Sequence, residues 1–368
     1  MSRSNILFVA QRPGERVLKI ALALKKRGVQ TSAIFRGAFG DQDLQRYFDF
    51  VRIEPEASEI ARVVSRTPVD FVHLHAYAFD NVCAEIIYNS GKKIVYDPKD
   101  VFPGIMDGFL PKNVADGQLY LLQHAHGLIM RDGQAHLSAR LLGTPLRGKR
   151  IFFPDLCWSR ELCSVKSSFQ ERPDERCLKM IFIGNFHPER QFPQWDGSGQ
   201  LRVFSKILQL GHMIHVYPSK NNVNHDYTDY QKLAVLHQDR LKFFPPVGEE
   251  QLLKKILPSY DFGIHVVQAS VFPGLGTYWN DKLHRYGMAA RIFDYLSAGL
   301  DIIVDNPTSK LLIEKTGFSL KLKNFDSFQS DMFNFLQGWT FGVERERVIS
   351  RLSIDRYVDK LLNFYRSI

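Results

Sequence analysis

The chain has 368 residues, of which 45% are hydrophobic and 24% charged. These values exclude a mainly disordered protein and suit two domains of ordinary size. The formal net charge of +9 is spread over both halves, without a basic tail. No RNA- or DNA-binding motif accompanies it, so we expect no nucleic-acid partner. The excess of positive charge is explained by a site for phosphate-bearing ligands or by a surface that rests peripherally on the anionic inner face of a membrane.

Short apolar strands alternate with helical stretches through the first half of the sequence. Short apolar runs separated by helices are typical of a parallel sheet covered on both faces. The strands predicted here span 5–10, 31–36, 48–53, 70–75, 93–97, 127–131 and 150–153. The predicted helices span 14–28, 56–66, 79–90, 115–125 and 132–141.

The same alternation restarts after a charged, serine-rich stretch at 164–176, which we interpret as an interdomain linker. The second set of predicted strands spans 178–184, 212–217, 241–244, 261–267, 301–304 and 320–322. The helices expected with them span 199–210, 227–238, 249–257, 288–298, 307–316 and 325–338. The sequence therefore predicts two doubly wound units, each binding ligands at the carboxyl ends of its strands.

The last segment, 354–365, predicts an amphipathic helix whose apolar residues pack against another surface. We expect an N-terminal domain at 1–165, a second domain at 166–345, and a helical segment at 346–368 that crosses back to the first. No apolar run is long enough to span a bilayer, and residues 1–10 lack signal-peptide features. The four cysteines form no C-x-x-C pair. We therefore expect a cytoplasmic protein with reduced cysteines.

One segment carries a family resemblance. Residues 288–304, MAARIFDYLSAGLDIIV, resemble the donor-site helix and following strand of bacterial GT-B glycosyltransferases (group 1-like). DFVHLH at 70–75, KIVYD with Asp100 at 93–100, MIFIGN at 180–185 and YDFGI at 260–264 resemble further segments of that family, in the same order. Together they extend over nearly the whole chain. The resemblance implies two Rossmann-like domains facing a cleft, with the acceptor in the first domain and a nucleoside-diphosphate sugar in the second.

The donor site is expected on the helix at 288–298. Arg291, Asp294 and Tyr295 share one face by their spacing. A guanidinium beside a helix N-terminus suits a diphosphate. The resemblance implies that Arg291 binds the diphosphate and Asp294 the ribose, and an exposed Arg291–Asp294 pair is the alternative. Further donor-binding candidates are Gly184, Arg190, Gly276 and Lys282.

The sequence departs from the family pattern at two positions. Tyr286 stands where many relatives have a glutamate near the sugar, and Asp301 stands where proline is frequent. Sugar identity therefore stays open. A sugar-nucleotide epimerase of the same fold and a non-catalytic sugar- or nucleotide-binding protein remain as alternatives.

The first half offers its own site candidates. His73 and His75 share one face of a strand, with His75 at its carboxyl end. The resemblance implies that His75 lies near the transferred sugar or the acceptor, whereas a structural histidine is the alternative. Asp97, followed by proline, is expected to start a turn. Asp100 is the candidate base that deprotonates an acceptor hydroxyl.

The loop after the first strand contains Arg12 and Gly14, which are candidates for a phosphate or sugar contact, although the loop is not G-x-G-x-x-G. No group of His, Asp and Glu has metal-ligand spacing in the sequence, so we expect neither metal nor cofactor. The sequence thus predicts a metal-independent glycosyltransferase, as in polysaccharide biosynthesis. It would move a sugar to a glycan, lipid-linked or small hydroxyl acceptor.

Overall fold

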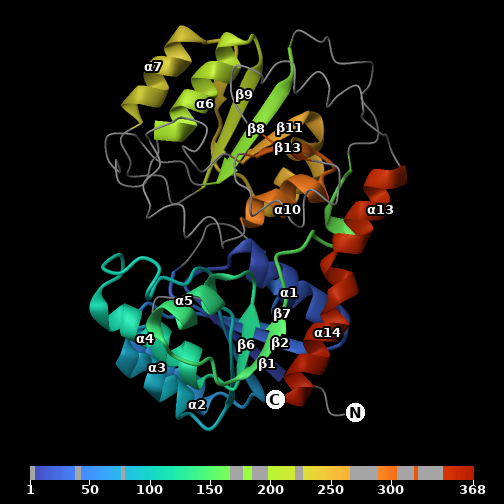
Figure 1. The fold of residues 1–368 in the computed structure, drawn as a ribbon. Helices are drawn as coiled ribbons and strands as arrows, with labels where there is room; N and C mark the ends of the chain where they lie inside the picture. Colours follow the sequence, from blue (N-terminus) through green and yellow to red (C-terminus); the bar gives the residue numbers. More distant parts are fainter. Residues whose placement is uncertain are drawn as a thin grey trace. The chain divides into compact units, whose positions relative to one another are not determined.

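The computed structural model describes residues 5–37, 43–75, 79–165, 177–184, 198–219, 227–265, 289–304, 319–321 and 343–368. These residues form two compact units (Figure 1). Unit 1 contains the described residues of 5–155 together with 354–368, and unit 2 contains those of 156–265 and 289–353. Both units are of the predicted α/β class.

Unit 1 is built on a seven-stranded sheet in the order β3-β2-β1-β4-β5-β6-β7, with every pair of neighbours parallel. The strands are β1 (Asn5–Ala10), β2 (Gln30–Phe35), β3 (Phe50–Ile53), β4 (Phe71–His75), β5 (Lys93–Tyr96), β6 (Gly127–Met130) and β7 (Lys149–Phe152). The chain direction across the sheet reverses between β1 and β4. Ligands of doubly wound sheets bind at the carboxyl edge beside such a reversal.

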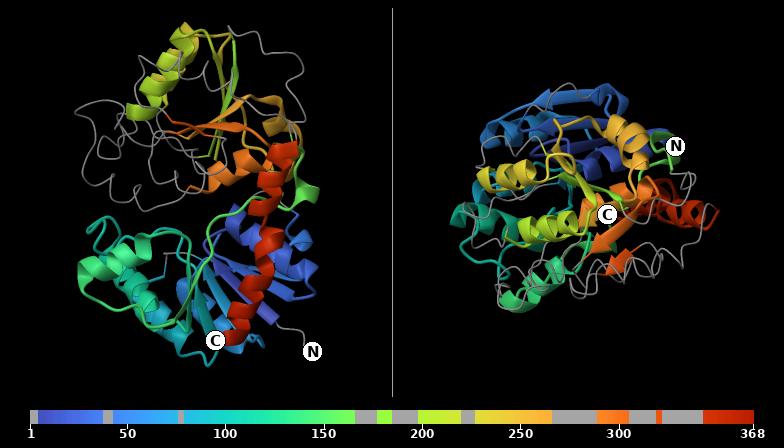
Figure 2. Two further views of the ribbon diagram at one scale, coloured as in Figure 1. Left: turned by 45° about the vertical axis from the view of Figure 1, so that its right-hand side comes forward. Right: turned by 90° about the horizontal axis from the view of Figure 1, so that it is seen from above.

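Alternate side chains of this sheet enter two different layers. Leu7 and Val9 pack into the core formed with α2 (Ala57–Arg66), α3 (Asn81–Tyr88), α4 (Lys112–His124) and α5 (Gln134–Leu142). Phe8 points to the opposite face, because successive strand residues alternate. On that face α1 (Glu15–Lys26) and α14 (Ile354–Ser367) lie side by side (Figures 1 and 2).

The C-terminal helix α14 confirms the prediction of an amphipathic helix at 354–365 with a buried apolar face. Its buried residues recur at helical spacing and include Val358, Leu361, Leu362 and Tyr365. The helix belongs to unit 1 although the preceding helix, α13 (Val343–Leu352), belongs to unit 2. Packing of this apolar stripe accounts for the return of the chain to the first unit.

Unit 2 repeats the same topology with six parallel strands in the order β10-β9-β8-β11-β12-β13. They are β8 (Lys179–Gly184), β9 (Met213–Pro218), β10 (Leu241–Phe243), β11 (Phe262–His265), β12 (Asp301–Val304) and β13 (Ser319–Lys321). The helices are α6 (Ser198–Gln209), α7 (Thr228–Leu236), α8 (Glu249–Gln251), α10 (Ala290–Ser297) and α13. Here the reversal lies between β8 and β11.

Three helices predicted for the second unit are not found as expected in the described structure. The helix expected at 249–257 is a short α8, followed by a π-helical turn at Leu252–Ile256 and a 3-10 turn at Leu257–Ser259. The helices expected at 307–316 and 325–338 lie outside the described residues. No helix in the described part of the chain is long and apolar enough to cross a membrane.

Candidate functional site

The two histidines of β4 lie at the reversal of the unit 1 sheet. His73 and His75 are alternate strand residues, so both side chains point to the face of α1 and α14. His75 is the last residue of β4 and pairs in register with Ala10 of β1. His73 is fully buried and stacks on the ring of Phe8, with 4.8 Å between ring centroids.

A buried ion-pair network surrounds the histidines. Arg16, in the first turn of α1, lies 2.8 Å from the carboxylate of Asp97 and 3.0 Å from that of Asp155. All three side chains are at most 5% exposed. Arg16 also donates to the backbone oxygens of Phe153 and Pro154. One guanidinium therefore ties the start of α1 to the residues that follow β5 and β7.

The network extends to a second buried arginine, Arg131, which follows β6. Its guanidinium lies 3.6 Å from Asp155, 3.4 Å from Asp132 and 3.3 Å from Asp100. Burial alone would lower the pKa of Arg131, but these carboxylates outweigh it and raise that pKa. The carboxyl ends of β5, β6 and β7 are thus joined by alternating charges.

Asp97 is the centre of this arrangement. Burial alone would raise the pKa of its carboxyl group, yet Arg16, His73 and His75 hold it well below the ordinary range. Asp97 is therefore a carboxylate at neutral pH. The expectation that Asp97 merely starts a turn is wrong, because residues 97 and 98 form no turn and the buried carboxylate pairs with Arg16, 81 positions away.

The hydrogen bonds fix which ring nitrogens carry protons. His75 Nδ1 lies 2.9 Å from the backbone oxygen of Asp97, which can only accept, so Nδ1 carries the proton. The lone pair of His75 is then on Nε2. This is the tautomer that a histidine needs in order to accept a proton, or a substrate hydrogen bond, through Nε2.

The distances also group His73, His75 and Asp97 as a possible metal-binding set, with ligand atoms within 4.8 Å of one another. The spacing of these residues in the sequence did not reveal this. Arg16 already lies 2.8 Å from the carboxylate that a cation would use. A cation on this carboxylate would lie next to the guanidinium, and neighbouring like charges repel strongly in a buried site, so we assign no metal to the set.

In unit 2 the structure brings two predicted donor residues together. The guanidinium of Arg291, near the start of α10, lies over the ring of Phe182, with 4.7 Å from Cζ to the ring centroid. A β-carbon at Gly184, the last residue of β8, would lie 3.2 Å from Nη2 of Arg291. The backbone at Gly184 has φ of 93°, a conformation that favours glycine. Glycine thus allows the guanidinium to lie against the carboxyl end of β8.

The other two predicted residues of α10 are buried. Asp294 is 1% exposed and accepts a hydrogen bond of 2.9 Å from the indole nitrogen of Trp158. The alternative of an exposed Arg291–Asp294 pair is therefore wrong. The Tyr295 hydroxyl accepts from the N–H of Ile183 and donates to the oxygen of Ile264, both at 3.1 Å. It thereby joins β8 to β11 where the direct pairing of these strands has ended.

The remaining candidates are placed less centrally. Gly14 is the N-cap of α1 and donates to the oxygen of Arg12, so the loop directs α1 and its Arg16 toward Asp97. The ion pair with Arg131 engages one carboxylate oxygen of Asp100. Arg190, Gly276 and Lys282 lie outside the described residues. The donor, acceptor and catalytic roles of all these residues stay predictions.

Sequence reasoning missed several residues of the two sites. Arg131 is the last residue of the strand predicted at 127–131, and Asp155 lies two residues after the strand predicted at 150–153. A position at the carboxyl end of a strand is a signal that could have found them, as it found His75. Arg16, Trp158 and Tyr365 carried no such signal. They reach their partners from a helix face or a loop, and only the tertiary structure shows those contacts.

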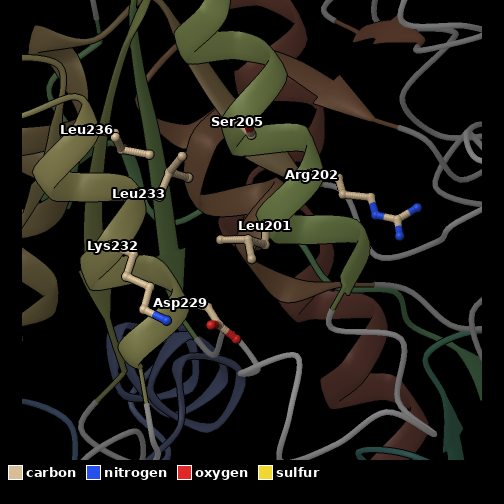
Figure 3. Close-up of a pocket in the computed structure, with 7 residues that line it drawn as sticks. All are labelled: Leu201, Arg202, Ser205, Asp229, Lys232, Leu233 and Leu236. Carbon is tan, nitrogen blue, oxygen red and sulfur yellow. The ribbon is translucent and has the colours of Figure 1, made fainter.

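A surface groove of about 540 Å³ lies elsewhere in unit 2, between α6 and α7 (Figure 3). Leu201, Leu233 and Leu236 give it apolar walls, and Arg202 and Lys232 are exposed at its rim. Asp229 and Ser205 complete the lining. None of the residues predicted for donor or acceptor binding lies in this groove.

No protein-family model and no curated protein matches the sequence. Solved structures match it over its full length. Sucrose-phosphate synthase from Thermosynechococcus elongatus is 11% identical, with a TM-score of 0.69 and coverage of 99% of both chains. HepE from Anabaena, in complex with UDP and glucose, is 12% identical, with a TM-score of 0.68 and coverage of 100% of both chains.

A glycosyltransferase from Rickettsia africae is also similar, at 12% identity and a TM-score of 0.66 over 100% of this chain and 99% of its own. At such low identity these matches show the fold alone. The fold is that of the GT-B glycosyltransferases, as the sequence resemblance predicted.

Proposed function

We propose that this protein is a glycosyltransferase that moves a sugar from a nucleoside diphosphate to a hydroxyl group of a glycan, lipid-linked or small acceptor. The observation that carries the proposal is the position of Arg291 against Gly184 at the carboxyl end of β8, beside the reversal of the unit 2 sheet. The full-length similarity to glycosyltransferases, one of them solved with UDP and glucose, supports it.

Donor binding is proposed for unit 2. A guanidinium binds two phosphate oxygens at once, and the N-terminus of α10 adds free N–H groups and a favourable dipole. Such groups can stabilise the charge that develops on the leaving diphosphate. The proposed transfer therefore needs no metal ion.

Acceptor binding is proposed for unit 1, with His75 as the residue that contacts the substrate. Its Nε2 carries the lone pair because Nδ1 donates to Asp97. We favour His75 over Asp100 as proton acceptor, since Arg131 already engages a carboxylate oxygen of Asp100. Asp97 would stabilise the protonated ring as the reaction proceeds.

The test is calorimetric titration of UDP, GDP, ADP and CMP and their sugars into wild type and Arg291→Ala. The variant should bind the preferred nucleotide at least about tenfold more weakly, because a charge-assisted hydrogen bond contributes about 1.5–3 kcal/mol. Arg351→Ala, which removes an exposed arginine of the same unit, is the matched control. Equal affinity of Arg291→Ala and wild type would refute the donor site.

Activity assays separate the proposal from its alternatives. An epimerase converts the bound donor to an isomer without any acceptor, whereas a transferase consumes the donor when a hydroxyl acceptor is added. A non-catalytic binding protein binds the same nucleotide but neither isomerises the donor nor transfers its sugar to an acceptor. The donor found by calorimetry should therefore be incubated alone and with acceptors.

We further propose that the protein contacts an anionic membrane surface peripherally, through the groove between α6 and α7. Val235 and Leu236, at the end of α7, are 65% and 76% exposed. Exposed Lys232 and Arg202 lie on the same two helices (Figure 3). Apolar side chains beside basic ones are the chemistry that binds anionic lipid surfaces.

A further inference from the structure

We propose that the C-terminal helix α14 is a functional part of the histidine site in unit 1, with Tyr365 as a positioning residue. The Tyr365 hydroxyl fixes the ring of His73, and His73 in turn fixes the carboxylate of Asp97 beside His75. The inference rests on the proposed function only in expecting His75 to contact substrate.

The hydroxyl of Tyr365 is the first link. The side chain is 1% exposed, and its oxygen lies 2.5 Å from Nδ1 of His73. Packing alone would be served by phenylalanine, because a buried hydroxyl is costly unless it finds a partner. Burial raises the pKa of Tyr365 well above its ordinary value, so the oxygen keeps its proton and donates it.

The proton order through His73 follows from its two partners. Asp97 is a carboxylate and can only accept, so the Nε2 of His73, at 3.2 Å, carries the ring proton. Nδ1 is then the bare nitrogen and accepts from Tyr365. Burial lowers the pKa of His73, which favours the neutral ring that this order requires. Tyr365 thus donates to His73, and His73 donates to Asp97.

The groups that face His73 leave little freedom for another arrangement. They are Phe8 from β1, Arg16 from α1, His75 from β4, Asp97 after β5 and Tyr365 from α14. Only Tyr365 among these donates to Nδ1. If its hydroxyl were removed, Nδ1 would be left as a buried acceptor without a donor, and the ring would lose the contact that holds its Nε2–H toward the Asp97 carboxylate.

The Asp97 carboxylate depends on the contacts at one of its oxygens. Oδ2 accepts from Arg16 and His73 and lies 3.4 Å from Nδ1 of His75. Oδ1 is buried, and no described residue forms a hydrogen bond with it. Loss of the His73 bond would therefore leave Arg16 as the main group that sets the carboxylate beside His75.

The helix that supplies Tyr365 is held against α1 and the sheet at its middle and at its C-terminal end. Asp359 of α14 forms an ion pair of 2.9 Å with Arg27, at the end of α1. Lys360 donates to the oxygen of Phe152 at 3.2 Å, and Lys149 donates to the oxygen of Ser367. These contacts keep the position of the hydroxyl defined relative to β4.

The test is Tyr365→Phe, which keeps the ring and removes only the hydroxyl, with Tyr357→Phe on the same helix as the matched control. Nitrogen-15 NMR of histidine-labelled full-length protein reports which ring nitrogen is protonated. Wild type and Tyr357→Phe should show bare Nδ1 in His73 and bare Nε2 in His75. Tyr365→Phe should keep the His73 proton on Nε2, shift the signal of His73 Nδ1, which has lost its donor, and shift the His75 signals.

Kinetics provide the functional readout. With an active donor and acceptor, Tyr365→Phe should lower kcat about tenfold or more and leave the KM for the donor unchanged, since only the histidine site is altered. Unchanged His75 signals in folded Tyr365→Phe would overturn the proposal. A wild-type His73 protonated on Nδ1 would overturn it whether or not the variant folds. The NMR result does not depend on turnover, so failure of this inference is distinct from failure of the proposed function.

Discussion

Four buried charged residues of unit 1, Arg16, Asp97, Arg131 and Asp155, each have a neighbour of opposite sign. Arg16 pairs with Asp97 and Asp155, and Arg131 pairs with Asp155 and Asp100. Desolvation makes each ion costly to bury. Removal of one partner leaves an uncompensated buried charge, which typically destabilises the folded state by about 3–5 kcal/mol. The chain tolerates this cost at the carboxyl edge of the sheet. We interpret the network as the support that orients His75.

Acidification should destabilise unit 1 through His73. Burial holds the pKa of the folded His73 below its usual value of 6.5, so the unfolded chain takes up this proton first as pH falls. The stability contributed by the neutral ring is complete above pH 6.5 and declines below it, by at most about 1.4 kcal/mol per pH unit. The pKa of Asp97 lies well below 3.8, so its contribution is lost only in stronger acid.

The measurement is the free energy of unfolding from pH 8 to pH 5 for wild type, His73→Gln and His136→Gln. Burial lowers the pKa of other histidines as well, such as His212 and His215, so the His73 variant should show a shallower decline and not a flat one. His136, exposed on α5, serves as the control and should keep the wild-type slope. Equal slopes for all three proteins would contradict the assignment.

At the scale of elements, the contact between α10 and the unit 2 sheet depends on one glycine. A β-carbon at Gly263 of β11 would lie 2.3 Å from Cγ of Tyr295, which is closer than any real contact. The missing side chain lets the tyrosine ring lie on the sheet and its hydroxyl reach between β8 and β11. Glycine in a strand often marks such a close approach.

Gly263→Ala should therefore destabilise unit 2 by about 1–3 kcal/mol or more, because the ring of Tyr295 must be displaced. Gly248→Ala is the control, since its β-carbon would meet no atom within 4 Å and its φ is −72°. As an N-cap, Gly248 should cost no more than about 1 kcal/mol on replacement. Chemical denaturation followed by circular dichroism compares the two, and similar losses would rule out the crowding explanation.

At the scale of the whole molecule, the net charge of +9 favours association with anionic surfaces. The exposed apolar end of α7 gives this general attraction a defined place. The proposed membrane contact therefore predicts binding to vesicles of phosphatidylglycerol, little binding to phosphatidylcholine, and release by salt.

Co-sedimentation with these vesicles should be reduced several-fold by Leu236→Asp, since the change places a negative charge and removes an apolar group at the surface. Val82→Asp on α3 of unit 1 is the matched control, because Val82 is 60% exposed and Leu236 is 76% exposed. If both variants lost vesicle binding equally, the loss would be explained by the change in net charge. If Leu236→Asp lost no vesicle binding, this surface would be excluded as the membrane contact.

The local pattern of residues was sufficient to predict most of the architecture. The strands predicted at 5–10 and 70–75 correspond to β1 and β4, because runs of this length indicate strands, and the intervening helices follow the helical period. The two-residue period placed His73 and His75 on one face, and the apolar stripe of α14 predicted its burial. These features depend on near neighbours in the chain, which the sequence shows directly.

The partners of the site residues were decided only by tertiary structure. Asp97 meets Arg16 across 81 positions, Asp294 meets Trp158 across 136, and His73 meets Tyr365 across 292. Such pairs depend on strand order, on register and on the face that each helix presents, and no local period encodes them. The sequence by itself thus determined two parallel α/β units and where on each to look. Packing decided which charges are neutralised and which histidine nitrogen carries the lone pair.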